Sequence, residues 1–374
     1  MPSDANTPLQ RLAALGQSVW VDYLSRDLIH GGELQQLMDR SAVTGATSNP
    51  TIFQKAMTAG EAYDEQLHEL SAEHGRDVTE TFWALAEQDV ADACDAFRPV
   101  WERTSGDDGY ASIEVDPRLA YDTLATFREA MRLHQEISKA NLLVKIPATK
   151  PGLAAIEDAV AKGRSINVTL IFSLRRYAEV AESYIRGIER LIAEGGDPRG
   201  VHSVASFFVS RIDTEADRRL DEIGGHEHLK GKLAIANAKL AYEHYRETFA
   251  GPRWDFLAAK GARPQRVLWA STSTKNPAYA DTMYVEELIG SDTIDTMPEE
   301  TIQAYQDHGD PAERLPQDVQ DAREVFEQLR AAGVDYDDVT ATLEREGVEK
   351  FSSSFDELLD ALRAKQESLA PASA

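Results

Sequence analysis

The chain has 374 residues, and 64 acidic against 39 basic side chains give it a formal net charge of −25. A field of that sign repels nucleic acid and anionic membrane surfaces, so we expect neither as a partner. No stretch is long and apolar enough to span a bilayer, the N-terminus lacks a leader pattern, and the single cysteine, Cys94, excludes an internal disulfide. We therefore expect a soluble, cytoplasmic protein.

Strand and helix patterns alternate along most of the chain. Short apolar runs without a helical period indicate strands that are buried on both faces, as in a parallel sheet. We predict eight such strands, the last one weakly patterned, at 18–24, 42–48, 110–117, 141–149, 166–172, 202–211, 266–271 and 282–286. Apolar residues at a spacing of about 3.6 predict helices at 9–16, 33–39, 51–101, 121–138, 152–162, 174–194 and 228–249.

This alternation, without a second run of strands, predicts an α/β fold: a (β/α)8 TIM barrel with additional N- and C-terminal helices. We assign residues 1–310 to the barrel domain and residues 311–374 to a C-terminal helical extension. Within the extension we predict helices at 318–332, 337–346 and 351–365, and we expect them to pack on the outside of the barrel.

Polar side chains lie near the C-terminal ends of most of the predicted strands, where barrels of this type hold their chemistry. Each has a simple structural explanation, such as a helix cap for Asp22, a turn before Pro50 for Asn49 or a solvated strand face for Glu114. One shared site explains the whole set better than separate accidents on successive strands. The set comprises Asp22, Asn49, Glu114, Lys145, Asn167, Thr169 and Ser206, with Arg211 just beyond the sixth strand.

Lys145 is a single cation inside the apolar run 142–146. Its stem could pack at the strand end while its amine stays in water. Alternatively, burial disfavours the charged form of an amine, and a neutral amine can attack a carbonyl carbon to form a Schiff base. Such chemistry needs one carboxyl group to help dehydrate the carbinolamine and another to accept a hydroxyl proton as a C–C bond breaks, and Glu114 and Asp22 can serve these roles.

The set contains no His or Cys cluster and the chain has no glycine-rich phosphate loop, so we expect neither a metal nor a cofactor. Hydroxyl and amide side chains suit a polyol. Arg211 and Lys275 suit a terminal phosphate, although both could also be solvent-facing charges. The residues thus indicate a class I aldolase or aldol transferase that acts on a sugar phosphate.

Four motifs resemble the transaldolase family: ATSNPT at 46–51, SIEVDPRL at 112–119, LVKIPAT at 143–149 and INVTLIFS at 166–173. The resemblance implies that Lys145 is the Schiff-base lysine, that Asp22 is an acid/base residue, and that Glu114 works through a water held by Thr169. It also implies that Arg211 binds the phosphate. The resemblance further implies that four more residues bind the substrate: Thr47, Asn49, Asn167 and Ser206. Where many members have an arginine after the seventh strand, this chain has Lys275 at a slightly different spacing.

The resemblance implies a transaldolase of the pentose phosphate pathway, which transfers a dihydroxyacetone unit from sedoheptulose 7-phosphate to glyceraldehyde 3-phosphate. Two alternatives remain. A fructose 6-phosphate aldolase is disfavoured because it resembles a shorter barrel, and a non-catalytic binding protein is disfavoured because Lys145, Glu114 and Asp22 are all present. We expect sugar phosphates as partners and a monomer or homodimer.

Overall fold

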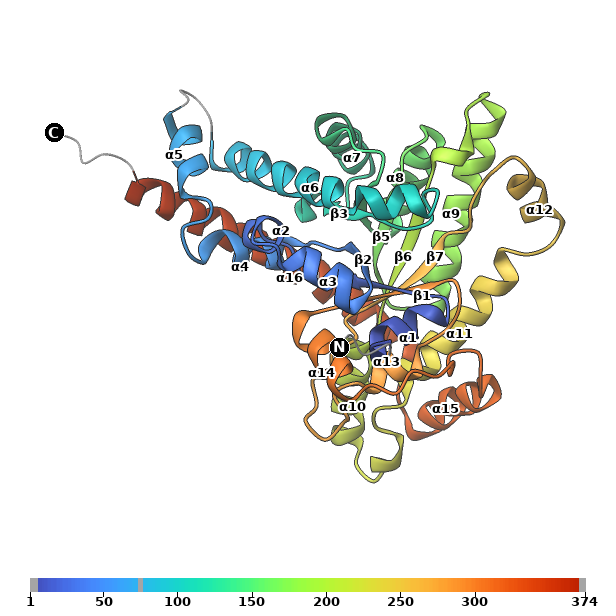
Figure 1. The fold of residues 1–374 in the computed structure, drawn as a ribbon. Coiled ribbons are helices and arrows are strands. Elements are labelled where there is room, and N and C mark those ends of the chain that lie inside the picture. The colour runs from blue at the N-terminus through green and yellow to red at the C-terminus, as the bar shows by residue number, and fades with distance from the viewer. Residues whose placement is uncertain (1–5, 73–76, 370–374) are drawn as a thin grey trace.

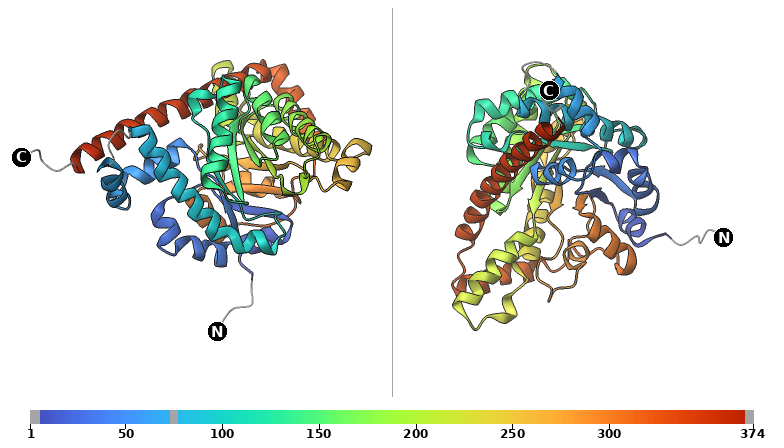
Figure 2. Two further views of the ribbon diagram at one scale, coloured as in Figure 1. Left: turned by 90° about the horizontal axis from the view of Figure 1, so that it is seen from above. Right: turned by 90° about the vertical axis from the view of Figure 1, so that its left-hand side faces the viewer.

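The computed structural model describes residues 6–72 and 77–369, and at its centre eight parallel strands form a closed barrel in chain order (Figure 1, Figure 2). The pairing of β8 with β1 closes the barrel, which confirms the predicted fold class. The strands are β1 (Gln17–Val21), β2 (Val43–Ala46), β3 (Ala111–Glu114), β4 (Leu142–Pro147), β5 (Ile166–Ile171), β6 (Ser203–Phe208), β7 (Arg266–Ala270) and β8 (Thr293–Met297).

Helices surround this barrel and follow its strands. In the first half they are α1 (Pro8–Ala14), α2 (Arg26–His30), α3 (Glu33–Ser41), α4 (Pro50–Thr58), α5 (Asp64–Ala72), α6 (Val78–Arg103), α7 (Thr123–Ile137) and α8 (Lys150–Ala161). In the second half they are α9 (Leu174–Ala193), α10 (Ser210–Ile223), α11 (Leu233–Thr248), α12 (Pro252–Ala259), α13 (Met283–Glu287), α14 (Glu299–His308), α15 (Val319–Ala332) and α16 (Tyr336–Leu369). Short 3-10 turns occur at η1 (Pro117–Leu119), η2 (Pro198–Gly200) and η3 (Glu227–Leu229).

The predicted strand at 282–286 is wrong, because this segment forms helix α13 and the eighth strand lies about ten residues further on. Apolar residues spaced as on one helix face are all buried here: Tyr284, Val285, Leu288 and Ile289. The apolar pattern did not predict β8, because three of its five residues are polar. All three are nevertheless buried: Thr293, Asp295 and Thr296. The sequence pattern also missed helices α2, α10, α12 and α14.

The two helices predicted at 337–346 and 351–365 are one continuous helix, α16. Gly347 lies between the two predicted segments, and glycine weakens helices by roughly 1 kcal/mol relative to alanine. In the structure Gly347 is buried, and a Cβ atom added there would lie 3.0 Å from Leu170 Cδ2. Its missing side chain therefore lets α16 approach the end of β5, and packing keeps the helix continuous where propensity is weak.

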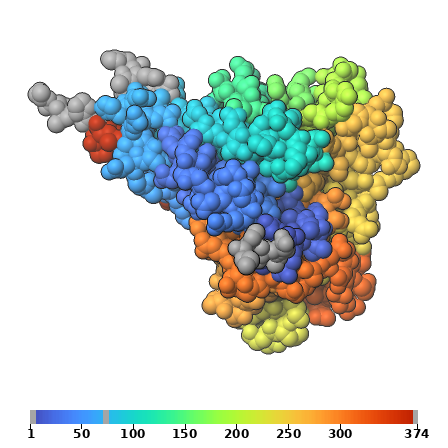
Figure 3. All heavy atoms as spheres, viewed as in Figure 1, coloured from blue at the N-terminus to red at the C-terminus, as the bar shows by residue number. Residues whose placement is uncertain are grey.

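The C-terminal extension packs on the outer helices of the barrel and also reaches the end of one of its strands. α15 packs on α11, as expected for an outer helix, but α16 packs on α4, α6 and α10 and reaches the end of β5 (Figure 2). Phe355 anchors α16: its ring centroid lies 5.1 Å from that of Phe82, and the Arg118 guanidinium carbon lies 4.8 Å from its centroid. Further along, Lys365 pairs with Asp64 on α5 at 2.6 Å, and the end of α16 projects beyond α5 in Figure 3.

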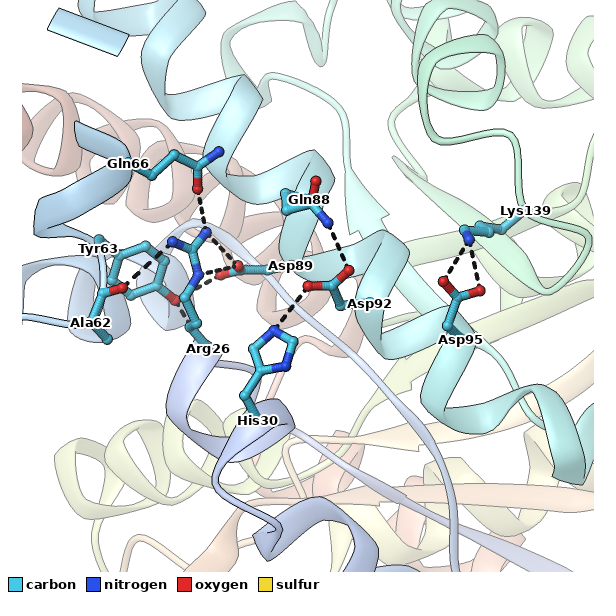
Figure 4. A network of polar contacts seen from close by, with 10 residues as sticks. All are labelled: Arg26, His30, Ala62, Tyr63, Gln66, Gln88, Asp89, Asp92, Asp95 and Lys139. Carbon is cyan, nitrogen blue, oxygen red and sulfur yellow. Dashed lines mark hydrogen bonds and ion pairs between the residues drawn. The ribbon is translucent and has the colours of Figure 1, made fainter. Parts of the chain in front are cut away.

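A buried ion pair holds the helical segment between β2 and β3 against α2 (Figure 4). Arg26 Nη2 lies 2.9 Å from Asp89 Oδ1 on α6, and the Asp89 side chain is fully buried. The hydroxyl of Tyr63 donates to Asp89 Oδ2 at 2.7 Å, and the Arg26 guanidinium carbon lies 4.5 Å from the Tyr63 ring centroid. Because removing either charge would leave the other buried and unpaired, this contact holds α6 in one position.

Candidate active site

A cavity of about 270 Å³ opens at the C-terminal ends of the strands. Eight of the ten side chains predicted to form a site line it: Asp22, Thr47, Asn49, Lys145, Thr169, Ser206, Arg211 and Lys275. The other two, Glu114 and Asn167, are buried behind this lining. The barrel therefore brings the predicted residues together, because the C-terminal ends of all parallel strands meet at one face.

Lys145 and Glu114 form a buried pair on neighbouring strands. The register of β3 and β4 places them opposite each other, and Lys145 Nζ lies 3.2 Å from Glu114 Oε2. Lys145 also donates a hydrogen bond of 2.8 Å to the carbonyl oxygen of Ser48. The residues are 4 % and 5 % exposed, and burial raises the pKa of Glu114, an effect that the adjacent Lys145 partly opposes. Proton exchange between the two groups is thus geometrically direct.

Asp22 lies across the cavity at the end of β1, held by a chain of two hydroxyl groups. Thr47 donates to Asp22 Oδ1 at 2.6 Å, and the Thr47 and Thr296 hydroxyl oxygens are 2.8 Å apart. Since the single Thr47 proton goes to Asp22, Thr296 must be the donor in the second contact. Burial raises the pKa of Asp22, and the hydrogen bond from Thr47 is the largest effect that opposes this rise. Two carboxyl groups with raised pKa values thus flank Lys145.

Thr169 lies in β5 beside an irregular piece of strand. The β5–β6 register shifts between Val168 and Ile171, and Leu170 has a φ of 59°, a left-handed conformation that is rare for a leucine. The Thr169 hydroxyl and Glu114 Oε1 are buried without a hydrogen-bond partner among the described residues, while Glu114 Oε2 faces Lys145. Polar groups at this depth are normally hydrogen-bonded. Both side chains are therefore available for bonding to something beyond the protein itself.

Hydrogen bonds within the protein hold three of the predicted substrate-binding residues: Asn167, Ser206 and Asn49. Asn167 is fully buried, donates to Ser112 Oγ at 3.2 Å and accepts from Ser206 Oγ at 2.7 Å, so it acts behind Ser206 rather than on the cavity wall. Asn49 caps α4, because its Oδ1 accepts from Ile52 N at 3.0 Å. Asn49 is thus a helix cap rather than a turn residue, and it also lines the cavity, since the cap uses only its side-chain oxygen.

Arg211 lies in the first turn of α10, where two aromatic rings hold its guanidinium group. The guanidinium carbon is 5.1 Å from the ring centroid of Phe208 and 6.0 Å from that of Phe351 on α16. Burial lowers the pKa of Arg211, and Asp22 and then Glu114 oppose this shift. Lys275 also lines the cavity from the loop after β7 and donates to Ser273 Oγ at 2.7 Å.

The lining residues that sequence reasoning missed include Lys55, Thr296, Lys350 and Phe351. Lys55 lies in α4, which begins directly after β2, and this short connection is a signal that its first turns face the site. Thr296 was hidden by the misplaced eighth strand. Lys350 and Phe351 had no local signal, because helix packing alone brings them to the barrel.

Neither a metal centre nor a membrane helix is visible in the described parts of the chain. Residues 6–72 and 77–369 contain no group of three or more His, Cys, Asp or Glu side chains that could hold a metal ion. In the same residues, each helix is too short or too polar to cross a bilayer.

A third carboxyl group, Asp295, lies on β8 directly before Thr296. It is fully buried and accepts a 2.8 Å hydrogen bond from Thr272, while its Oδ2 has no partner among the described residues. Burial raises the pKa of Asp295 to about 8 from its ordinary value of 3.8. The folded protein therefore holds a proton here that the unfolded chain releases above pH 4, and the stability from this group falls as pH rises to about 8.

We expect Asp295→Asn to remove this pH dependence. Relative to the unaltered protein, the variant should gain free energy of unfolding between pH 5 and pH 8, by at most roughly 4 kcal/mol, since one pH unit is worth about 1.4 kcal/mol for one proton. Urea unfolding at both pH values measures the difference, with Asp292→Asn in the neighbouring loop as a control. Equal pH slopes for Asp295→Asn and the unaltered protein would contradict a buried neutral carboxyl group.

Known proteins that are similar to this chain carry the name transaldolase or belong to the family that includes it. A family model described as Transaldolase/Fructose-6-phosphate aldolase matches residues 19–362. A protein named transaldolase from Acidothermus cellulolyticus is 52 % identical over 362 residues, which cover 96 % of this chain and 97 % of the relative. Proteins of the same name are similar at 51 % identity in Frankia alni (95 % and 96 % covered) and at 50 % in Mycobacterium tuberculosis (98 % and 99 % covered).

Proposed function

The chain belongs to the transaldolase/fructose-6-phosphate aldolase family, and we propose that it is a transaldolase that works through a Schiff base on Lys145. It transfers a dihydroxyacetone unit from sedoheptulose 7-phosphate to glyceraldehyde 3-phosphate, which gives erythrose 4-phosphate and fructose 6-phosphate, and the reaction is reversible. The observation that carries this proposal is the 3.2 Å contact between Lys145 Nζ and Glu114 Oε2, made at the wall of a cavity that Lys145 and Asp22 both line.

The first step joins the substrate to the enzyme. Lys145 attacks the C2 ketone of the ketose phosphate, and the carbinolamine loses water to give the imine. Glu114 moves the protons of this dehydration, through a water molecule that Thr169 holds. The Thr169 hydroxyl and Glu114 Oε1, which are buried without a hydrogen-bond partner among the described residues, support these roles.

The second step breaks the C3–C4 bond. Asp22 takes the C4 hydroxyl proton, the bonding electrons move into the imine, and an aldose phosphate leaves. The three-carbon enamine stays on Lys145 until an acceptor aldehyde adds to it, after which hydrolysis frees the new ketose phosphate. The raised pKa of Asp22 suits a group that must accept and return a proton. Thr47 and Thr296 keep its carboxyl group in place.

The remaining lining residues bind the substrate. Asn49 and Ser206 bond the hydroxyl groups of the dihydroxyacetone unit, and Asn167 fixes Ser206 from behind. Arg211 and Lys275 bind the terminal phosphate. We also propose that the enzyme acts in the cytoplasm, as a monomer or homodimer, without a metal or cofactor, and that residues 311–374 form a C-terminal helical extension packed on the barrel. The absence of a cysteine pair agrees with a reducing compartment.

Product release without an acceptor separates transfer from simple cleavage. We expect fructose 6-phosphate alone to release about one equivalent of glyceraldehyde 3-phosphate per active site, because the enamine then waits on the enzyme. Erythrose 4-phosphate should restart continuous release. Sustained release from fructose 6-phosphate alone, together with net synthesis from dihydroxyacetone and glyceraldehyde 3-phosphate, would instead identify the fructose 6-phosphate aldolase alternative.

A further inference from the structure

Besides Lys145, four cationic side chains from four separate elements line the cavity: Lys55 on α4, Arg211 on α10, Lys275 after β7 and Lys350 on α16. Among the described residues, none of the four forms an ion pair with a carboxylate. This is unusual in a chain with 64 acidic and 39 basic residues, where carboxylates are plentiful. The carboxyl groups of the lining are Asp22 and Glu300; the charges of Lys145 and Arg211 oppose the rise in the pKa of Asp22, and the charge of Glu300 adds to it.

Lys350 lies close to the other three cations. The positive charge of Arg211 is the main cause that lowers the pKa of Lys350, followed by burial and by the charges of Lys275 and Lys55. Its neighbour Phe351 packs on the same guanidinium group, with its ring centroid 6.0 Å from the Arg211 guanidinium carbon. Two consecutive residues of α16 thus act on Arg211, one by stacking and one by like charge.

Like charges in one cavity repel each other, and an anion bound between them removes that cost. A phosphate group suits this position, because it carries up to two negative charges and accepts charge-assisted hydrogen bonds at three oxygens. We propose that Lys350 and Lys55 complete the phosphate site formed by Arg211 and Lys275, so that the C-terminal helix determines the preference for phosphorylated substrates. This inference rests on the proposed function, because it assigns further residues to the same substrate.

The test compares Lys350→Met with Arg345→Met. Both variants remove one positive charge from an exposed position of α16, but Arg345 does not line the cavity. Borohydride trapping of the imine is measured at increasing concentrations of fructose 6-phosphate, and separately of dihydroxyacetone, which lacks a phosphate. We expect Lys350→Met to raise the half-saturating concentration of fructose 6-phosphate about 10- to 100-fold, the worth of one charge-assisted hydrogen bond, and to leave dihydroxyacetone unchanged.

Inorganic phosphate gives a second readout. It should compete with fructose 6-phosphate on the unaltered enzyme and on Arg345→Met, and the competition should weaken by a similar factor in Lys350→Met. Unchanged saturation by fructose 6-phosphate in Lys350→Met, or an equal loss for both compounds, would overturn the inference. Failure of the unaltered enzyme to trap either compound would instead overturn the proposed function, so the two failures are distinguishable.

Discussion

Replacing Lys145 by alanine is expected to lower turnover by at least about 10⁴-fold, because the variant loses the atom that forms the covalent intermediate. Borohydride trapping with fructose 6-phosphate, followed by mass spectrometry of the peptides, gives the direct readout. The unaltered enzyme should carry three substrate carbons on the peptide that contains Lys145, and the variant should carry none. This result would establish the Schiff base, the cleavage step and the retained enamine together.

The variant must remain folded for this test to be informative. Glu114 loses its cation, but burial already raises the pKa of this carboxyl group, so we expect it to take up a proton rather than unfold the barrel. Circular dichroism checks this. Lys162→Ala is the matched control, since the Lys162 side chain is 50 % exposed and pairs with Glu194 on the surface. Turnover of Lys145→Ala close to that of the control would refute the covalent mechanism.

Replacing Asp22 by asparagine is expected to slow the reaction about 10²- to 10⁴-fold, the usual contribution of general acid–base catalysis. Asparagine keeps an oxygen that can accept the hydrogen bond from Thr47, so the site geometry should survive. Because Asp22 acts after the imine has formed, the intermediate should accumulate uncleaved. Trapping should therefore yield an adduct with all six carbons and the phosphate, where the unaltered enzyme yields three carbons.

Glu114→Gln provides the contrasting outcome. Glu114 serves imine formation, so this variant should trap little adduct of either size. If Asp22→Asn instead gave the three-carbon adduct at the normal rate, Asp22 would not be the base for C–C cleavage. The pair of variants thus assigns the two buried carboxyl groups, Glu114 beside Lys145 and Asp22 beside Thr47, to separate steps.

The parts of the site that could be predicted lie on strands of clear apolar pattern. Lys145 interrupts such a run. The parallel arrangement places Glu114 of β3 opposite Lys145, and Thr169 of β5 opposite Pro147 of β4. Asn167 shows where this reasoning stops. Its position on β5 was predictable, but its orientation behind Ser206 depends on hydrogen bonds between strands that periodicity does not contain.

The sequence by itself determined the barrel, the family and the polar residues of six strand ends, because strand period and local motifs are short-range properties. The tertiary structure decided the position of β8 and hence of Thr296, since polar residues that are buried on this strand break the apolar pattern by which a strand is predicted. It also decided that α16 stays continuous at Gly347 and carries Lys350 and Phe351 to the cavity. Contacts between residues that are distant in the chain fix these features, and such contacts leave no local period in the sequence.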